Sequence, residues 1–379
     1  MKNCCVIAGM VVFCMFVVSA TVVNGADTAV DRKPVLLFEL PEPCNTPDGC
    51  TLADDGNLIL SVPNFNNKAL KQQGVIDKDA PAVMLCIDKN NKVSTWYEFK
   101  KEDLQADTGI VGPMGCDFGP DGHLYLADNQ LFSNGANKSR LLRIRCENGK
   151  PVKCEVIVEG FIVANAVVWK GDTVYVSETI LSHPPKETAG KGKVPLYSGT
   201  YAFNIDEFKN GPVKLAPWSA ANPDPHLIAT YATSGRIGFG ADGLTVDGEG
   251  NLYCGIFEDG VLYRTRFDSA GKVVDTRVFA FDAKMACCDG IFWNKADNTI
   301  YVADMLQNAV QAVDMSGNVT TVHRNGDTTG ADGLLDQPCE VHVRGNELIV
   351  INMDMPWESD LLANKKIDKP YTVSAIKLQ

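Results

Sequence analysis

Clusters of lysine and arginine are missing from this sequence. It has 35 Lys and Arg against 47 Asp and Glu, which gives a formal net charge of -12. Nucleic acids and anionic membrane surfaces bind clustered basic side chains, so the composition argues against either partner. An acidic surface serves solubility by default, and it also accommodates a cation.

Several short motifs of enzymes are absent as well. The sequence contains neither G-x-S-x-G nor H-E-x-x-H, so neither a serine α/β-hydrolase nor a zincin is supported. No two cysteines have C-x-x-C spacing, which disfavours zinc. The letters G-x-G-x-x-G do occur at Gly238–Gly243, but a strand pattern follows them, whereas a dinucleotide site needs a helix there.

No linker, low-complexity block or charge run divides the chain. We expect one domain over residues 26–379, since all-β architectures often run long as single units. Before it, residues 1–25 are predicted to be a secretory signal peptide, because an uncharged apolar run extends from Cys4 to Val23. An uncleaved membrane anchor is the alternative. The predicted destination is extracellular, or periplasmic in a bacterium, where sequons at Asn137 and Asn318 are candidate glycosylation sites in a glycosylating host.

Three of the 13 cysteines lie in the predicted signal peptide, which leaves ten, an even number, for an oxidising compartment. Disulfides are therefore expected. Cys146 and Cys154 flank Glu147-Asn148-Gly149-Lys150, and an Asn-Gly turn would bring the two arms of a hairpin face to face. Cys44 with Cys50 is a second candidate pair.

One pattern recurs six times after the predicted signal peptide. It begins with a polar residue that is usually followed by glycine, and continues with a short apolar strand, a Gly/Asn turn and another apolar strand. Successive copies are roughly 45 to 80 residues apart, enough for a four-stranded sheet with outer loops. We therefore predict an all-β fold, a six-bladed β-propeller with four-stranded blades around a central channel. A β-sandwich does not predict the same motif six times. Ring closure would pair residues 34–40 with residues 371–378 and hide two sheet edges.

The repeated polar position lies where the innermost strand of each blade begins, at one rim of the channel. It is occupied by Asp48, Met114, Asn165, Asp242, Asp289 and Cys339, with Glu340 beside the last. Three carboxylates and an amide oxygen that converge on one point repel each other unless a cation joins them. Oxygen ligands predict calcium, and the alternatives are magnesium and manganese. Taken singly, an Asp or Asn before glycine is instead typical of a turn.

These motifs resemble the gluconolactonase, regucalcin and luciferin-regenerating family, whose relatives include diisopropyl-fluorophosphatase and the paraoxonases. The resemblance spans nearly the whole mature chain and is most specific in two segments, Asn165 to Thr179 and Ala241 to Tyr253. It implies calcium at the channel mouth, held by a Glu of the first blade, an Asn of the third and an Asp of the fourth. An Asn of the second blade binds metal or substrate.

Carried over to this sequence, the resemblance implies metal ligands at Asp48, which replaces the Glu, and at Asn165 and Asp242, which match in type. Met114 stands where the second-blade Asn would be, and a thioether is a poor calcium ligand. Asp289 is the further metal ligand that compensates, or Glu340 does so from its neighbouring position.

The family chemistry is hydrolysis of a lactone or other ester: the cation polarises the carbonyl and water attacks. Asp242 or Asp289 is the predicted catalytic residue that orients or deprotonates this water. Met114 and Glu340 are expected to contact substrate. His183, at the head of a long loop, and His226 are expected to reach the mouth and shuttle a proton. The alternatives are a strictosidine-synthase-like enzyme that does not hydrolyse, and a non-catalytic propeller that binds a protein or carbohydrate.

Overall fold

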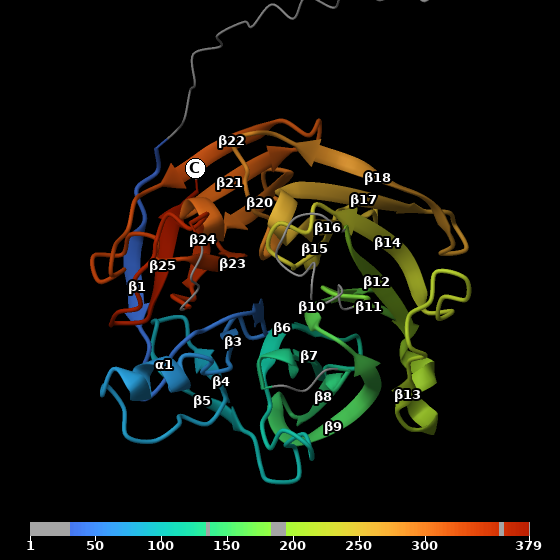
Figure 1. Cartoon of the computed structure of the whole chain (residues 1–379), viewed down its shortest axis with the longest axis horizontal. Coiled ribbons are helices and arrows are strands. Elements are labelled where there is room, and N and C mark those ends of the chain that lie inside the picture. Colours follow the sequence, from blue (N-terminus) through green and yellow to red (C-terminus); the bar gives the residue numbers. More distant parts are fainter. Residues whose placement is uncertain (1–30, 134–136, 183–194, 356–359, 379) are drawn as a thin grey trace, which may run out of the picture.

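The computed structural model shows six antiparallel sheets arranged in a ring around a central channel (Figure 1). It describes residues 31–133, 137–182, 195–355 and 360–378. Each sheet is a blade of four strands, and a fifth strand joins the second blade. The predicted six-bladed propeller is therefore confirmed. The predicted signal peptide and His183 lie outside the described residues, and none of the helices within them is long and apolar enough to span a membrane.

The blades follow one another in chain order, each starting with its innermost strand. Blade 1 contains β2 (Cys50–Leu52), β3 (Leu58–Val62), β4 (Val83–Ile87) and β5 (Val93–Glu98). Blade 2 contains β6 (Pro113–Phe118), β7 (Leu124–Asp128), β8 (Ser139–Glu147), β9 (Lys150–Phe161) and the added β13 (Val213–Lys214). Blade 3 contains β10 (Ala164–Lys170), β11 (Thr173–Glu178), β12 (Leu196–Asn204) and β14 (Leu227–Thr233).

The second half of the ring has the same plan. Blade 4 contains β15 (Ala241–Val246), β16 (Leu252–Ile256), β17 (Val261–Phe267) and β18 (Val273–Phe281). Blade 5 contains β19 (Ile291–Asn294), β20 (Thr299–Asp304), β21 (Ala309–Asp314) and β22 (Val319–Arg324). Blade 6 contains β23 (Pro338–Arg344), β24 (Glu347–Asn352), β25 (Thr372–Lys377) and β1 (Val35–Glu39).

Short helices follow the second strand of several blades and lie at the same end of the ring as the channel mouth. They are α1 (Asn67–Gln72), η1 (Leu131–Ser133), η3 (Phe257–Asp259) and η4 (Met305–Gln307), while η2 (Ile205–Asn210) follows β12. Through them, Phe132, Phe257 and Met305 reach the mouth of the channel. The blades thus provide a rigid frame, and the connections after their second strands line its opening.

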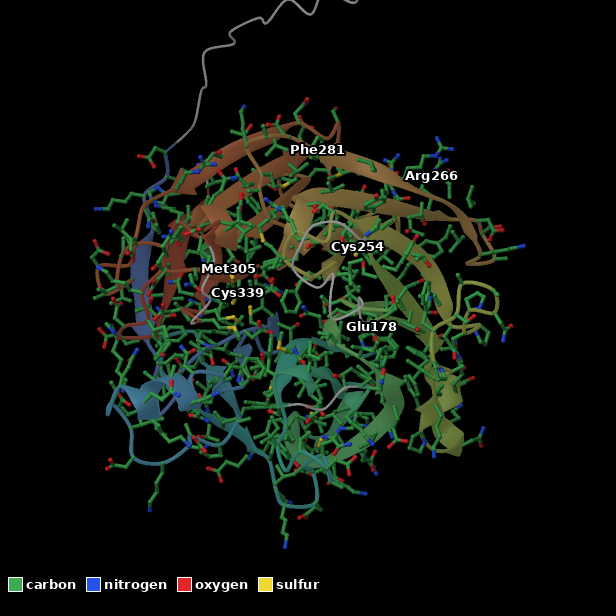
Figure 2. The ribbon with its side chains drawn as sticks, viewed as in Figure 1. Glu178, Cys254, Arg266, Phe281, Met305 and Cys339 are labelled. Atoms are coloured by element: carbon green, nitrogen blue, oxygen red, sulfur yellow. The ribbon has the colours of Figure 1, made fainter. Side chains whose placement is uncertain are left out.

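The second strand of each blade forms the core, because the neighbouring blades cover both of its faces. Strands β3, β7 and β16 are buried along their whole length, and β11, β20 and β24 are buried except for their first residue. A strand covered on both faces needs a continuous apolar run, such as Ile300-Tyr301-Val302-Ala303 in β20. Outer strands alternate instead, and Arg266 and Phe281 lie at the periphery, far from Cys339 near the channel (Figure 2).

The ring closes where the two ends of the chain pair. Strand β1 completes blade 6 beside β25, with Val35 opposite Ala375 and Glu39 opposite Thr372. Figure 1 shows the blue first strand beside the red last one. The predicted closure is confirmed, and it joins both ends of the described chain into a sheet in place of two exposed edges.

Glycine follows the rim residue because adjacent innermost strands approach each other closely. A Cβ on Gly243 would lie 2.3 Å from the backbone oxygen of Asp289, and one on Gly49 would lie 2.4 Å from the Cα of Gly115. In blades 2, 3 and 4 the rim residue and its small successor have no ladder partner, as in a β-bulge. Asp242-Gly243 therefore does not form a turn: like the corresponding residues of blades 2 and 3, it forms a bulge that aims the rim side chain into the channel.

The predicted disulfides are wrong. All ten cysteines in the described ranges carry free thiols, including both candidate pairs, Cys44 with Cys50 and Cys146 with Cys154. In the hairpin of β8 and β9, Cys146 lies opposite Pro151, and Cys154 lies opposite Ile144. The two-residue Asn-Gly turn pairs Glu147 with Lys150 and therefore Cys146 with Pro151, so the two cysteines lie at different distances from the turn and do not face each other. Asn137 and Asn318 are exposed, and glycosylation there stays a prediction.

Candidate functional site

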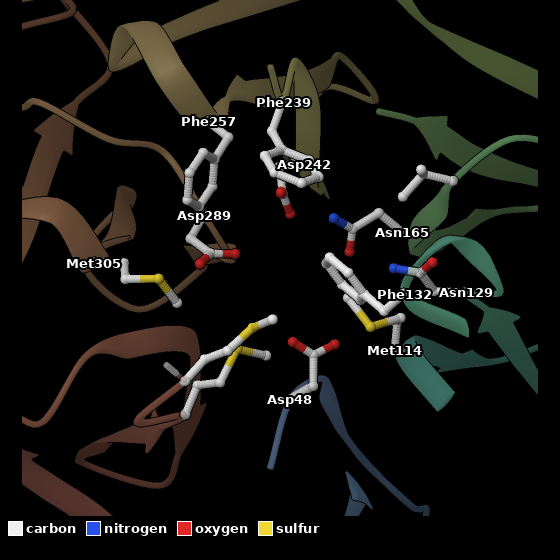
Figure 3. Close-up of a pocket in the computed structure, with 13 residues that line it drawn as sticks. Asp48, Met114, Asn129, Phe132, Asn165, Phe239, Asp242, Phe257, Asp289 and Met305 are labelled. Atoms are coloured by element: carbon white, nitrogen blue, oxygen red, sulfur yellow. The ribbon is translucent and has the colours of Figure 1, made fainter. Parts of the chain in front are cut away.

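A pocket of about 100 Å³ opens at the channel mouth, where the rim residues of five blades meet (Figure 3). Its lining is polar around the axis and apolar elsewhere. The residues that line it are Asp48, Met114, Asn129, Phe132, Val163, Asn165, Phe239, Asp242, Phe257, Asp289, Met305, Met353 and Met355. The convergence that the repeat predicted is therefore present: all four proposed metal ligands and Met114 share one pocket.

The carboxylates of the pocket are almost entirely buried. Asp48, Asp242 and Asp289 are 7%, 6% and 8% exposed, and their carboxyl groups point toward a common centre (Figure 3). Burial raises the pKa of Asp48 to about 7. Burial, together with the charges of the neighbouring carboxylates, raises the pKa of Asp242 and of Asp289 well above the ordinary value. No lysine, arginine or histidine is among the described residues that line the pocket. This site therefore holds excess negative charge that a cation would balance.

Asn165 is positioned by contacts across two blades. Its Nδ2 donates to Thr179 Oγ1 at 3.3 Å, and Thr179 Oγ1 donates to the backbone oxygen of Ala241 at 2.7 Å. This chain connects the rim of blade 3 to that of blade 4 and turns the amide oxygen of Asn165 into the pocket (Figure 3). Three carboxylates and one amide oxygen form a hard, all-oxygen donor set, which fits calcium.

Asn129 is a pocket residue that the sequence pattern did not identify. It follows β7 directly, is 1% exposed and lies beside Met114 (Figure 3). Its Oδ1 accepts a hydrogen bond from the backbone N–H of Leu131 at 2.9 Å, which leaves its Nδ2 as the donor for the pocket. An amide is thus present next to the position where the resemblance led us to expect one. The signal available in the sequence was the polar pair Asp128-Asn129 at the end of an apolar strand.

A second ring of polar side chains supports the rim. In every blade, a buried side chain at the end of the second strand, or two residues beyond it, accepts a hydrogen bond from a backbone N–H two to four residues before the rim residue. These acceptors and donors are Asn64 with Asn45, Asp128 with Gly112, Glu178 with Val163, Glu258 with Gly238, Asp304 with Ala286, and Asn352 with Asp336. The bonds hold the chain that leads into each rim position, so these six are positioning residues.

Glu340 and His226, which were both expected at the channel mouth, do not line the pocket. Glu340 lies deeper in the channel, in a separate cavity that Thr51 and His342 also line, because Cys339 occupies the rim position of blade 6. Its charge nevertheless acts on Asp289, whose pKa it helps to raise. His226 precedes the outermost strand of blade 3, where Asp224 and Glu207 hold its ring, each at 2.8 Å. It is remote from the lining of the pocket.

Comparisons with known proteins place this fold. A scan against family models finds no match to the sequence, and neither does a search of curated proteins. Solved structures are similar at low identity. A luciferin-regenerating enzyme is 12% identical with a TM-score of 0.56, covering 91% of this chain and 97% of that one. A gluconolactonase from Xanthomonas campestris is 10% identical with a TM-score of 0.53, covering 93% of each chain.

The same fold also carries other chemistry. The PQQ-bound aldose sugar dehydrogenase from Streptomyces coelicolor is 12% identical, with a TM-score of 0.50 and coverage of 92% of this chain and 98% of that one. Activity therefore has to be argued from the pocket. What the comparisons establish is that this chain has the six-bladed propeller fold of the gluconolactonase and luciferin-regenerating proteins, as its repeated motifs predicted.

Proposed function

We propose that this chain is a calcium-dependent hydrolase of lactones or other esters. The observation that carries the proposal is the meeting of Asp48, Asn165, Asp242 and Asp289 in one pocket whose described lining contains no basic side chain. A gluconolactonase among proteins of the same fold supports it. Bound calcium would supply a Lewis acid that polarises the ester carbonyl.

The lining of the pocket favours an ester with an apolar body. Eight of its residues are apolar, namely Met114, Phe132, Val163, Phe239, Phe257, Met305, Met353 and Met355. The hydroxyl groups of a sugar lactone would lose their hydrogen bonds to water against such walls, which costs free energy. We therefore infer that alkyl or aryl lactones are better substrates than sugar lactones.

Asn129 and the pair of Asp242 with Asp289 have distinct roles in this mechanism. The Nδ2 of Asn129 donates to the carbonyl oxygen of the substrate and stabilises the negative charge that develops there. Asp242 raises the pKa of Asp289, whereas the hydrogen bond with Asp289 lowers the pKa of Asp242, so without a cation Asp289 holds a proton while Asp242 stays ionised. Bound calcium would favour the ionised form of both carboxylates, and Asp242 or Asp289 accepts a proton from the attacking water while the apolar walls exclude further water.

Activity against a panel of alkyl and aryl lactones and aryl esters, in calcium and then in chelator, tests the proposal. We expect hydrolysis that stops on chelation, and Asp242→Asn to lose both calcium binding and turnover. The exposed Asp206→Asn is the matched control, because it removes the same charge far from the pocket. Asn129→Ala should lower kcat by about 100-fold, which is the effect of removing one oxyanion donor.

The outcomes separate the alternatives. Turnover that chelation leaves unchanged would contradict the calcium-dependent mechanism. Calcium binding without turnover of any ester would instead favour the non-catalytic propeller that binds a protein or carbohydrate. Condensation of substrates without hydrolysis would favour the strictosidine-synthase-like chemistry. We propose in addition that the protein is secreted, on the basis of the apolar run in residues 4–23, which mass determination of the mature N-terminus would test.

A further inference from the structure

Blade 6 carries a second group of acidic side chains, none of which lines the pocket. Asp336 lies just before β23, Asp354 follows β24, and Asp368 lies just before β25. One carboxylate oxygen from each residue lies within 4.8 Å of the oxygens from the other two. Residues up to 32 positions apart in the sequence thus converge where two connections meet, the one that leads into β23 and the one between β24 and β25.

Three carboxylate oxygens of this cluster, one from each residue, are buried and accept no hydrogen bond. Asp336 and Asp354 are each 1% exposed. Asp336 Oδ1 accepts a hydrogen bond from Asn364 Nδ2, and Asp354 Oδ2 accepts one from the backbone N–H of Asp368 at 2.9 Å. The other oxygen of each residue, Asp336 Oδ2 and Asp354 Oδ1, is buried without a hydrogen bond, and so is Asp368 Oδ1. Buried polar atoms are rarely left unsatisfied, so these three oxygens indicate a ligand.

The surrounding charges do not neutralise the cluster. Asp327 adds a further negative charge, which helps to raise the pKa of Asp336, Asp354 and Asp368. Among the described residues, the basic side chain that acts on the cluster is Lys366, which is 74% exposed and lies 4.0 Å from Asp327. A largely hydrated lysine at the edge does not pair with buried carboxylates at the centre.

We propose that Asp336, Asp354 and Asp368 bind a calcium ion at a site separate from the pocket. Carboxylates are the hard ligands that calcium prefers. Calcium–oxygen distances of about 2.3–2.6 Å place ligands on opposite sides of the ion about 5 Å apart, so separations of up to 4.8 Å suit it. Magnesium, at about 2.0–2.1 Å, would require a tighter cluster.

This site stabilises the wall of the pocket and the closure of the ring. Asp354 lies between Met353 and Met355, which both line the pocket. The backbone oxygen of Asp354 also accepts a hydrogen bond from Asn66 Nδ2 of blade 1 at 2.6 Å. A cation held by Asp354 therefore fixes the segment between blade 6, blade 1 and the channel mouth. The inference is independent of the proposed function, because it concerns different ligands.

Calcium titration calorimetry of the chelator-treated full chain tests the proposal. We expect two sites in the wild type: Asp354→Asn should remove one, Asp242→Asn the other, and the double variant both. Asp360→Asn is the matched control, because it removes an exposed carboxylate from the same connection. A wild type whose calcium stoichiometry and affinity are unchanged by Asp354→Asn would overturn the proposal, and so would an equal loss in Asp360→Asn.

Thermal unfolding gives a second readout that does not depend on activity. In chelator, Asp354→Asn should unfold at the same or a higher temperature than the wild type, because it removes repulsion between buried carboxylates. In calcium, the wild type should gain more in Tm than the variant does. An equal calcium-dependent gain in both proteins would contradict the site. If Asp354→Asn does not fold, Asp368→Asn replaces it, since Asp368 is less buried.

Discussion

Replacing Asp48 by asparagine distinguishes two effects of this carboxylate: its cost to the free energy of unfolding without a cation, and its contribution to binding one. Burial raises the pKa of Asp48 from 3.8 to about 7. The folded protein thus binds this proton more tightly than the unfolded chain does. Its free energy of unfolding therefore falls as the pH rises from about 4 to about 7, when no cation is bound. At 1.36 kcal/mol per pKa unit, the full cost above pH 7 is on the order of 4 kcal/mol.

In chelator at pH 8, Asp48→Asn should therefore be more stable than the wild type by up to about 4 kcal/mol, and at pH 4 the two proteins should be equal. Calcium should reverse the trend. At one hundred times the wild-type Kd it stabilises the wild type by about 2.7 kcal/mol, and the variant lacks a ligand and gains less. Urea denaturation of both proteins at pH 4 and pH 8, with and without calcium, measures the difference in their free energies of unfolding under each of the four conditions.

Asp54→Asn is the control for Asp48→Asn, because Asp54 is an exposed carboxylate of the same blade. It should leave the unfolding free energy within about 0.5 kcal/mol of the wild type in every condition. A variant at Asp48 that is less stable than the wild type in chelator at pH 8 would refute the reasoning. So would an advantage that neither pH nor calcium changes.

Three further predictions follow from the frame of the site. Gly243→Ala should destabilise the protein by about 1–3 kcal/mol in urea denaturation, because the added Cβ would lie 2.3 Å from the backbone of the next blade. Gly326→Ala is the control and should be nearly neutral, because there is open space around Gly326. Arg140→Met should lower the free energy of unfolding by about 3–5 kcal/mol in urea denaturation, because it leaves the buried charge of Asp128 without its ionic partner. Lys209→Met is the control and should lower it by less than about 1 kcal/mol, because Lys209 belongs to an exposed ion pair. Met114→Asn should raise calcium affinity about tenfold by calorimetry, since an amide oxygen replaces a thioether, and unchanged affinity would place Met114 outside the coordination shell.

Much of the fold could be predicted from the sequence because each blade repeats the same local constraints. The Asp-Gly step recurs in blades 1, 4 and 5 since the residue after the rim position has to be small enough to pass the neighbouring strand, as at Asp242-Gly243. Apolar runs recur since every second strand is covered on both faces. Because such requirements act within a few residues, they produce a pattern that recurs in the sequence once per blade. The meeting of Asp48, Asn165 and Asp242 in one pocket followed directly from that register.

Other features depended on contacts that the local pattern does not encode. Cys154 lies opposite Ile144 because the register shifts between Arg145 and Cys146, and His226 lies against Asp224 and Glu207 on the outer part of its blade. Asn129 reaches the pocket only because Leu131 occupies its amide oxygen.

The acidic cluster of blade 6 is the clearest example of a feature that depends on tertiary contacts and not on the local sequence pattern. Asp336 belongs to the connection before β23, whereas Asp354 and Asp368 belong to the connection between β24 and β25, and no spacing between them suggests a site. The sequence by itself determined the number of blades and the residues at the rim, because repeated short-range packing requires them. The tertiary structure alone decided which loop side chains meet, because the path of a connection depends on everything packed around it.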